Sequence, residues 1–276
     1  MVVRSSATSK NHRATGSRRF GHVLRPARES ALTLINHEAQ SVVSSQCSAS
    51  LVDDKYYEVA RPGSFGEALT IRARNRIYDD FIRICGPKPE ETVLDVGVSD
   101  AIGNGPNVLE RQYPYPEHLT AVGLGTGDDF RTAFPRVTYR QIRPNACLPF
   151  PDDSFDIVTS NAVLEHVGSA ENQSQFLEEL MRVARRTFIT IPNRFFPIEH
   201  HTAIPLLHWT DSGFRLMCYL LGKQYWSRPE NLILMSRRRL LRLCPRGMRV
   251  QIGRTGLMLG PCSSNVYLYL SGPRLD

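Results

Sequence analysis

Imidazole, carboxylate and aromatic side chains crowd one segment of the chain, residues 193–209, which contains Glu199, His200, His201 and His208. Because an imidazole titrates near neutral pH, one of these histidines can act as a general base or as a clamp on a substrate. The run Glu199-His200-His201 lacks the spacing of an H-E-x-x-H zinc site, so no metal is expected there. The alternative is a loop that covers a pocket with aromatic side chains.

A second segment whose residues can bind ligands or take part in catalysis is LPFPDDSFDIVTSNAVLEHV, residues 148–167. Turn residues precede a buried strand at 155–159, and the polar pair Ser160-Asn161 follows it. Open α/β sheets place their ligands at the carboxyl ends of parallel strands, which is where this pair is expected. Further on, His166 is a candidate base, although a packed, hydrogen-bonded histidine fits the pattern as well.

The third segment is ETVLDVGVSDAIGNGPN, residues 91–107, where a glycine-containing loop joins a strand to a helix. Gly97 permits a close approach of the backbone, and the free N–H groups of the next helix favour an anionic group. The dinucleotide fingerprint G-x-G-x-x-G is absent, which disfavours a nicotinamide oxidoreductase. A plain α/β turn that needs a glycine remains the alternative for this loop.

The order of these motifs, over roughly residues 91–192, resembles class I S-adenosylmethionine-dependent methyltransferases, particularly the small-molecule type 11 group. The resemblance implies S-adenosyl-L-methionine as cofactor, with an acid at the Asp95 position orienting the loop and the methionine amino group. The residues assigned to the cofactor on this basis are Asp95, Gly97, Ser99, Asp128, Asn145, Ala146, Ser160 and Asn161. The candidate catalytic residues are His200, His201 and His166, and no metal ligand is assigned.

The sequence departs from the family pattern at three places. Ser99 stands where a second glycine is usual, and Gly125 where an acid usually binds the ribose hydroxyls. Asp128 lies just beyond and can reach back, or it is an ordinary acid at a helix N-terminus. Asn145 replaces the usual aspartate beside the adenine, whose edge an amide can also bind. A non-catalytic relative with a decayed cofactor pocket is therefore the alternative function.

Hydrophobic periodicity, together with capping residues, Gly and Pro, predicts the helices and strands that position these residues. A helix begins at the S-x-x-E capping box of Ser64 and ends at Gly86, and another has Pro106 in its first turn. The remaining expectations are strands at 92–96, 119–124, 137–142, 155–159, 187–191, 249–253 and 265–270, and helices at 128–134, near 176–184 and from Ser236 to 244. Two closing strands without a helix between them predict an antiparallel hairpin.

The predicted fold is an α/β, three-layer, Rossmann-like sheet of seven mostly parallel strands with an antiparallel edge hairpin and a mostly helical insertion after strand five. Residues 51–276 are expected to form the methyltransferase domain, with 193–235 as the insertion or lid. The seven-stranded order is supplied by the resemblance. The insertion is rich in apolar residues, which also suits a membrane-touching segment or a dimer surface.

Charge and composition limit the partners. The chain of 276 residues has a formal net charge of +7, of which residues 1–50 supply +5, from seven Lys or Arg and two Asp or Glu. This basic Ser/Arg-rich arm is expected to be disordered, and specific nucleic-acid binding is disfavoured. No apolar run is long enough for a transmembrane segment, and the six scattered cysteines suit a reducing, cytoplasmic setting, with organelle import by the arm as the alternative.

Together these expectations predict an enzyme that transfers a methyl group from S-adenosylmethionine to a small-molecule acceptor, which the apolar insertion allows to be hydrophobic or lipid-linked.

Overall fold

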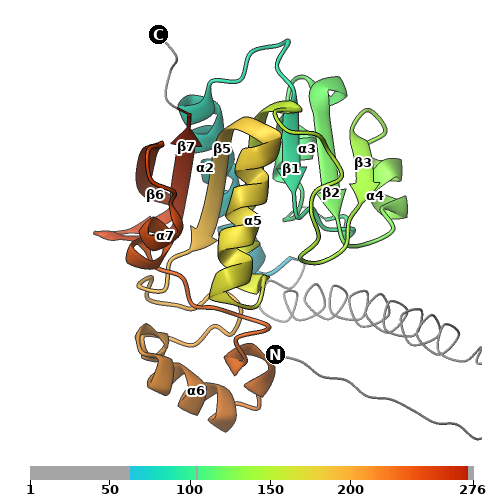
Figure 1. The fold of residues 1–276 in the computed structure, drawn as a ribbon. Helices are drawn as coiled ribbons and strands as arrows, with labels where there is room; N and C mark the ends of the chain where they lie inside the picture. The colour runs from blue at the N-terminus through green and yellow to red at the C-terminus, as the bar shows by residue number, and fades with distance from the viewer. Residues whose placement is uncertain (1–62, 104, 273–276) are drawn as a thin grey trace, which may run out of the picture. The chain divides into compact units, whose positions relative to one another are not determined.

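A single seven-stranded sheet organises the protein, in the order β3-β2-β1-β4-β5-β7-β6 (Figure 1). The structure, a computed structural model, describes residues 63–103 and 105–272. The strands are β1 (Val93–Val96), β2 (Leu119–Gly123), β3 (Thr138–Gln141), β4 (Phe155–Asn161), β5 (Ala184–Pro192), β6 (Arg249–Leu259) and β7 (Cys262–Ser271). The first five pair in parallel, whereas β7 runs antiparallel to both β5 and β6. The predicted fold class is confirmed.

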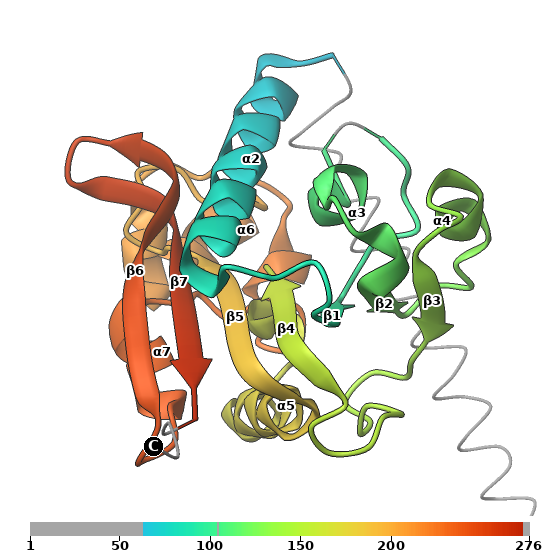
Figure 2. The same cartoon turned by 90° about the horizontal axis from the view of Figure 1, so that it is seen from above.

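Helices cover both faces of this sheet, with α2, α3 and α4 on one side and α5 and α7 on the other (Figure 2). The helices and short 3₁₀ turns are α2 (Phe65–Cys85), α3 (Val108–Gln112), η1 (Pro116–His118), α4 (Asp128–Ala133), η2 (Leu164–His166), α5 (Ala170–Val183), η3 (Leu207–Trp209), α6 (Asp211–Leu220), η4 (Gln224–Ser227) and α7 (Arg237–Leu243). Successive strand residues point to opposite faces, so Ile157 packs with Phe81 of α2 while Val158 packs with Leu177 of α5. Two apolar layers therefore hold the sheet between them.

The helix starts follow the capping chemistry of the sequence. The Ser64 side chain accepts a hydrogen bond from the Glu67 backbone N–H at 3.1 Å, and Gly86 ends α2 in the left-handed conformation at φ 53°. Ser169 and Ser236 cap α5 and α7 in the same way. The predicted capping box and the predicted cap at Ser236 are confirmed.

Several predicted boundaries are wrong. The closing strands are longer than expected, because β6 continues to Leu259 and β7 already begins at Cys262 across a tight turn. Pro106 lies before the helix, since Asn107 in the left-handed conformation precedes the first residue of α3. Ala184 opens β5 instead of closing a helical face. Each error falls where pairing with a neighbouring strand or a loop conformation overrides local propensity.

The segment between β5 and α7 forms a small helical unit beyond the carboxyl end of β5, with α6 as its longest helix (Figure 1). Five buried residues give it an apolar core of its own: Ile204, Phe214, Cys218, Trp226 and Leu232. A mostly helical insertion after strand five is confirmed. Its bounds at 193–235 and its role as a lid stay predictions.

Two further expectations concern parts of the chain beyond this core. The predicted basic arm, residues 1–50, and the start of the predicted domain at residue 51 lie outside the described residues. Among the described helices, none combines the length and apolarity needed to cross a membrane. The predicted compartment is not tested by this observation and stays a prediction.

Candidate active site

The ends of β1 and β4 meet at one edge of the sheet and enclose a cavity of about 100 Å³. Four residues that the sequence assigned to the cofactor line it: Asp95, Gly97, Ser99 and Asn161. The remaining wall includes the side chains of Tyr78 and Phe81 from α2, Glu110 from α3 and Phe188 from β5. Since β1 and β4 are adjacent and parallel, their polar carboxyl ends are brought together as expected.

Glu110 is a member of this wall that sequence reasoning missed. Its carboxylate is buried beside Asp95, and neither of its oxygens has a hydrogen-bond partner among the described residues. Burial raises the pKa of Asp95 to about 6. Burial and the nearby Asp95 charge raise the pKa of Glu110 well above its ordinary value. The two acids therefore favour sharing a proton unless a cation neutralises them.

The loop after β1 is held in shape by its own polar groups. The Asn107 amide accepts from the Ser99 backbone N–H at 3.2 Å and donates to the Ser99 carbonyl at 2.8 Å. Gly97 has φ 99°, and a Cβ there would lie 2.2 Å from Cγ2 of Val163. Glycine is thus required at 97 both by the backbone conformation and by the approach of the segment after β4.

An unexpected carboxylate occupies the end of β2. The sequence has Gly125 at this position, but a Cβ built there would lie 1.9 Å from Oδ2 of Asp100. The same oxygen accepts from the Gly127 backbone N–H at 3.1 Å, while Oδ1 is buried without a partner among the described residues. The glycine-rich loop therefore delivers an acid from residue 100 to the place where a side chain of residue 125 would stand.

The other four residues assigned to the cofactor do not line the cavity. Asp128 is exposed, accepts from the Thr126 hydroxyl at 2.9 Å and pairs with Arg131 at 3.6 Å. Asn145 and Ala146 lie in an exposed turn after β3. The Ser160 hydroxyl is buried and donates to the Val96 carbonyl at 2.7 Å, which ties β4 to β1. Their cofactor roles stay predictions.

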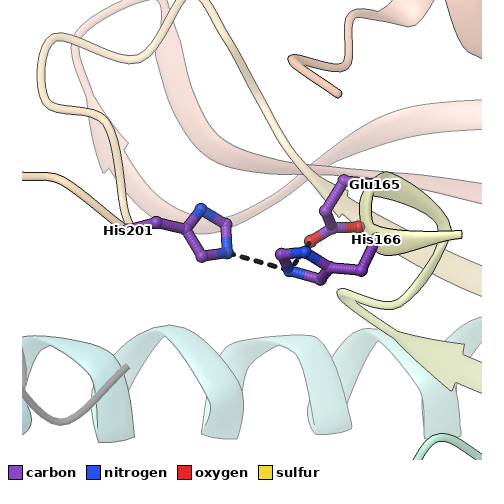
Figure 3. A group of neighbouring side chains, drawn as sticks. All are labelled: Glu165, His166 and His201. Carbon is purple, nitrogen blue, oxygen red and sulfur yellow. Dashed lines mark hydrogen bonds and ion pairs between the residues drawn. The ribbon is translucent and has the colours of Figure 1, made fainter. Parts of the chain in front are cut away.

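Two of the predicted catalytic histidines meet, although 35 positions separate them in the chain (Figure 3). His166, at the end of η2, and His201, in the loop after β5, bring their Nε2 atoms to 3.1 Å from one another. Oε1 of Glu165 lies 3.9 Å from Nε2 of His166. The Trp226 ring packs on both imidazoles, with centroid distances of 4.9 Å to His201 and 6.2 Å to His166.

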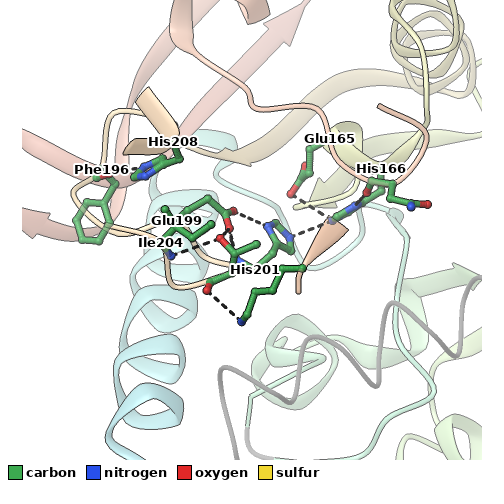
Figure 4. A network of polar contacts seen from close by, with 10 residues as sticks. Glu165, His166, Phe196, Glu199, His201, Ile204 and His208 are labelled. Atoms are coloured by element: carbon green, nitrogen blue, oxygen red, sulfur yellow. Dashed lines mark hydrogen bonds and ion pairs between the residues drawn. The ribbon is translucent and has the colours of Figure 1, made fainter. Parts of the chain in front are cut away.

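The outer nitrogens of the two rings are also bound (Figure 4). Nδ1 of His166 lies 2.6 Å from the Asn231 carbonyl, and Nδ1 of His201 lies 2.8 Å from Oε1 of Glu199. Glu199 also accepts from the backbone N–H groups of His201 and Thr202 and from the Thr202 hydroxyl. This carboxylate therefore stabilises the conformation of the loop that positions His201.

Burial and nearby charges shift the pKa values of these groups in different directions. Burial lowers the pKa of His166 to about 3, and the adjacent His201 charge adds to that shift. Burial also acts on His201, but the Glu199 carboxylate outweighs it and raises the pKa of His201. Burial raises the pKa of Glu165 to about 7, and both of its oxygens lack a hydrogen-bond partner within the described chain.

The third predicted catalytic histidine stands apart. His200 packs edge-on against Phe196, with ring centroids 5.8 Å apart, and lines a separate cavity of about 10 Å³. Burial lowers its pKa to about 4. His208 is buried nearby, with Nε2 2.9 Å from the Phe196 carbonyl (Figure 4). The structure thus joins His166 to His201 and leaves His200 outside that pair.

Comparison with known proteins agrees with this architecture. Residues 103–187 match the family model described as a methyltransferase domain, Methyltransf_11. This segment, less than half of the chain, is similar to the class I S-adenosylmethionine-dependent methyltransferases. The matched part of this methyltransferase domain runs from the loop after β1 into β5. The predicted cofactor, S-adenosyl-L-methionine, is the cofactor of this family.

Solved structures share the fold of this methyltransferase domain at low sequence identity. Magnesium protoporphyrin IX methyltransferase of Synechocystis PCC 6803, solved with bound SAH, is 12% identical, with a TM-score of 0.54 and coverage of 84% of this chain and 99% of that one. A Rhodobacter sphaeroides protein assigned to the Zn-dependent alcohol dehydrogenases is 13% identical, with a TM-score of 0.53 and coverage of 83% and 98%. By sequence, the chain matches no curated protein.

Proposed function

We propose that the chain transfers a methyl group from S-adenosylmethionine to a small-molecule acceptor. The observation that carries this proposal is the convergence of Asp95, Gly97 and Asn161 with Glu110 on one cavity at the ends of β1 and β4. This edge of the sheet is where open α/β folds bind their ligands. The bound cofactor supplies an electrophilic methyl group on a positively charged sulfur.

The residues present fit the methionine end of the cofactor. That end carries an ammonium group, a sulfonium and a carboxylate, and the wall of the cavity offers the buried Glu110 and the half-buried Asp95 to the two cationic groups. The oxygens of Glu110 lack hydrogen-bond partners among the described residues, so an ammonium group would supply the donors that they need. Asp95, two positions before Gly97, is the second carboxylate available to it.

We assign the ribose hydroxyls to Asp100. Its carboxylate stands where a side chain of residue 125 would be, and its free Oδ1 has acceptor capacity left for a hydroxyl group. On this proposal the chain keeps the acid that family members carry at the end of β2 but supplies it from the preceding loop. Asp128, the residue assigned from the sequence, is engaged with Thr126 and Arg131 at the surface.

On the acceptor side, we propose that His166 and His201 position the nucleophile. They belong to the segments after β4 and β5, the two loops that follow neighbouring parallel strands. Methyl transfer depends largely on holding the reacting atoms in line, so positioning groups suffice for much of the acceleration. His200, which packs against Phe196, remains a weaker candidate for direct contact.

The surface of the insertion favours a hydrophobic acceptor. Around α6 the exposed large apolar side chains are Leu206, Leu207, Trp209, Leu216, Tyr219, Leu220 and Leu221. Exposed apolar residues concentrated in a segment that follows a site-bearing strand suit an apolar ligand. A lipid-linked acceptor is one member of this class. An acceptor series that differs only in alkyl chain length tests it, with KM expected to fall as the chain lengthens.

Calorimetric titration with S-adenosylmethionine and with S-adenosylhomocysteine tests the donor half of the proposal. Both are expected to bind, and Asp95→Asn is expected to weaken both, whereas Asp152→Asn, at an exposed acid paired with Arg182, is the control and leaves affinity unchanged. Formation of S-adenosylhomocysteine with an acceptor series then tests turnover. If neither compound binds at millimolar concentration, the chain is a scaffold with a decayed pocket.

A further inference from the structure

We infer that Glu165, His166 and His201 form a binding site for a divalent transition-metal ion, with zinc as the best match. One ligand atom from each residue lies within 4.8 Å of the others, and none of the three is exposed. Two imidazoles and one carboxylate are a donor set that zinc uses in three-ligand catalytic sites. The inference concerns metal binding and does not depend on the methyl donor.

The distance between the two imidazoles suits a shared ion. A tetrahedral zinc with bonds of about 2.0–2.1 Å separates two nitrogen ligands by about 3.3 Å. The Nε2 atoms of His166 and His201 are 3.1 Å apart, and Oε1 of Glu165 lies 3.9 Å from Nε2 of His166. The three side chains lie together, with one ligand atom from each within 4.8 Å of the others (Figure 3).

The outer partners of the rings direct their lone pairs toward that point. The Asn231 carbonyl can only accept a hydrogen bond, so Nδ1 of His166 carries the proton and its Nε2 presents a lone pair. The Glu199 carboxylate has the same effect on His201. A histidine ligand whose other nitrogen donates to a carboxylate or a backbone carbonyl is the usual arrangement around protein-bound metals.

Glu165 supplies independent evidence for a ligand. Its side chain is about 1% exposed, and both carboxylate oxygens lack a hydrogen-bond partner in the part of the chain that the structure describes. A buried carboxylate without a partner is costly, and a bound cation removes that cost. The rival arrangement is metal-free: a proton on Nε2 of His201 is shared with His166, and Glu165 is neutral.

This ligand set differs from the one considered from the sequence. The run Glu199-His200-His201 is poorly spaced for zinc, and in the structure Glu199 binds the far side of the His201 ring (Figure 4). The actual neighbours of His201 come from η2, after β4. Three protein ligands leave a position for an oxygen of a water molecule or of an acceptor, which the ion would make more acidic.

Metal titration of the full chain tests the inference. After treatment with a chelator and dialysis, calorimetry with Zn²⁺ is expected to show one tight site per chain, and Co²⁺ to produce visible absorption bands of a tetrahedral complex. His166→Ala and His201→Ala are expected to weaken Zn²⁺ binding at least 100-fold. Glu199→Gln, which changes the partner of Nδ1 of His201, is expected to weaken it about 10- to 100-fold. His118→Ala, on η1, removes an imidazole elsewhere and leaves binding unchanged.

If a histidine variant fails to fold, Glu165→Gln provides a second test of the metal site. The amide has the same size but no charge, so in chelator this variant is expected to melt at or above the temperature of the parent chain. Added Zn²⁺ is expected to raise the melting temperature of the parent chain and to raise that of Glu165→Gln much less. Equal shifts in the two proteins, or no shift and no Zn²⁺ binding at micromolar concentration, overturn the inference in favour of the shared proton.

Discussion

Two buried carboxylates at the same edge of the sheet have opposite surroundings. Glu199 faces His201 and accepts four hydrogen bonds from that residue and Thr202. Glu110 faces the like charge of Asp95, and its oxygens accept none from the described residues. The first acid is compensated by its own loop and serves the structure of that loop. The second shares a proton with Asp95 unless a cation binds, which favours a cationic ligand at its wall of the cavity.

The largest expected effect is the loss of stability when Glu199, the acid that accepts four hydrogen bonds, is replaced. Glu199→Gln leaves the buried His201 without its counter-charge and replaces one of the two acceptor oxygens by an amide NH₂ group. Breaking a buried ion pair from one side costs about 3–5 kcal/mol, so the free energy of unfolding in urea is expected to fall by that order. Glu178→Gln, at an exposed acid on α5, is the control and is expected to change it by less than about 0.5 kcal/mol. Equal losses would remove the contrast between the two acids.

The second effect tests where the ribose acid comes from. Asp100→Gly is expected to weaken S-adenosylmethionine binding about 10- to 100-fold, since a hydrogen bond to a charged group contributes about 1.5–3 kcal/mol. Gly125→Asp alone places two carboxylates in one space. The double variant moves the acid from residue 100 to residue 125, and calorimetry is expected to show most of the affinity restored. A double variant that is no better than Asp100→Gly contradicts the assignment.

The third effect is the pH dependence of donor binding. The pKa of Asp95 is raised to about 6, and that of Glu110 is raised as well, so near pH 5 the cavity wall is largely protonated. A cationic ligand favours the ionised forms, and its binding releases protons in this range. Affinity for S-adenosylmethionine is expected to rise roughly tenfold from pH 5 to pH 8, with proton release detected by calorimetry in buffers of different ionisation enthalpy. A flat profile argues against a cation at these acids.

The smallest effect concerns stability without a ligand. Acids whose pKa is raised by folding stabilise the protein below their ordinary pKa, and that contribution is lost as pH rises through the folded value, here about 6 for Asp95. Glu110→Gln removes one of the two like charges. It is expected to stabilise the ligand-free protein by about 1 kcal/mol at pH 8 and by almost nothing at pH 4.5, as measured by urea unfolding. A loss of stability at pH 8 would show that Glu110 is already paired.

Much of the fold follows from local signals in the sequence. The caps at Ser64 and Ser236, the buried strand before Ser160 and the alternation of strands with helices all act within a few residues, and each predicts its element. The boundaries that failed depend on distant partners. β6 and β7 extend because they pair with one another along most of their length, which no local pattern of Gly and Pro reveals.

The sequence predicts candidate site residues that lie at strand ends. It does not predict those that reach the cavity through the conformation of a loop or a short helix. Asp95 and Asn161 are fixed by the strands that carry them. Asp100 reaches Gly125 only through the conformation of its loop, and Glu110 looks like an ordinary acid of a helical first turn. No local signal marks Glu110, because it stands two residues from the buried Val108 and so does not share a face of α3 with it.

Gly97 was predicted for one reason and is required for another. The sequence suggested that its missing side chain makes room for the cofactor. In the structure that room is taken by Val163, from the segment after β4. A larger residue at 97 would therefore disturb the junction between β1 and β4, not only the cavity. The position was predictable from the motif, but its steric partner was not.

The separate apolar core of the insertion has an evolutionary consequence. Ile204, Phe214, Cys218, Trp226 and Leu232 pack with one another, while the sheet is closed by two other clusters. Mutations that reshape the exposed side of α6 therefore leave the packing of the sheet, and with it the strand ends, untouched. A lineage can change what this segment recognises by drift or selection without rebuilding the catalytic frame, and the insertion is where divergence among homologues should concentrate.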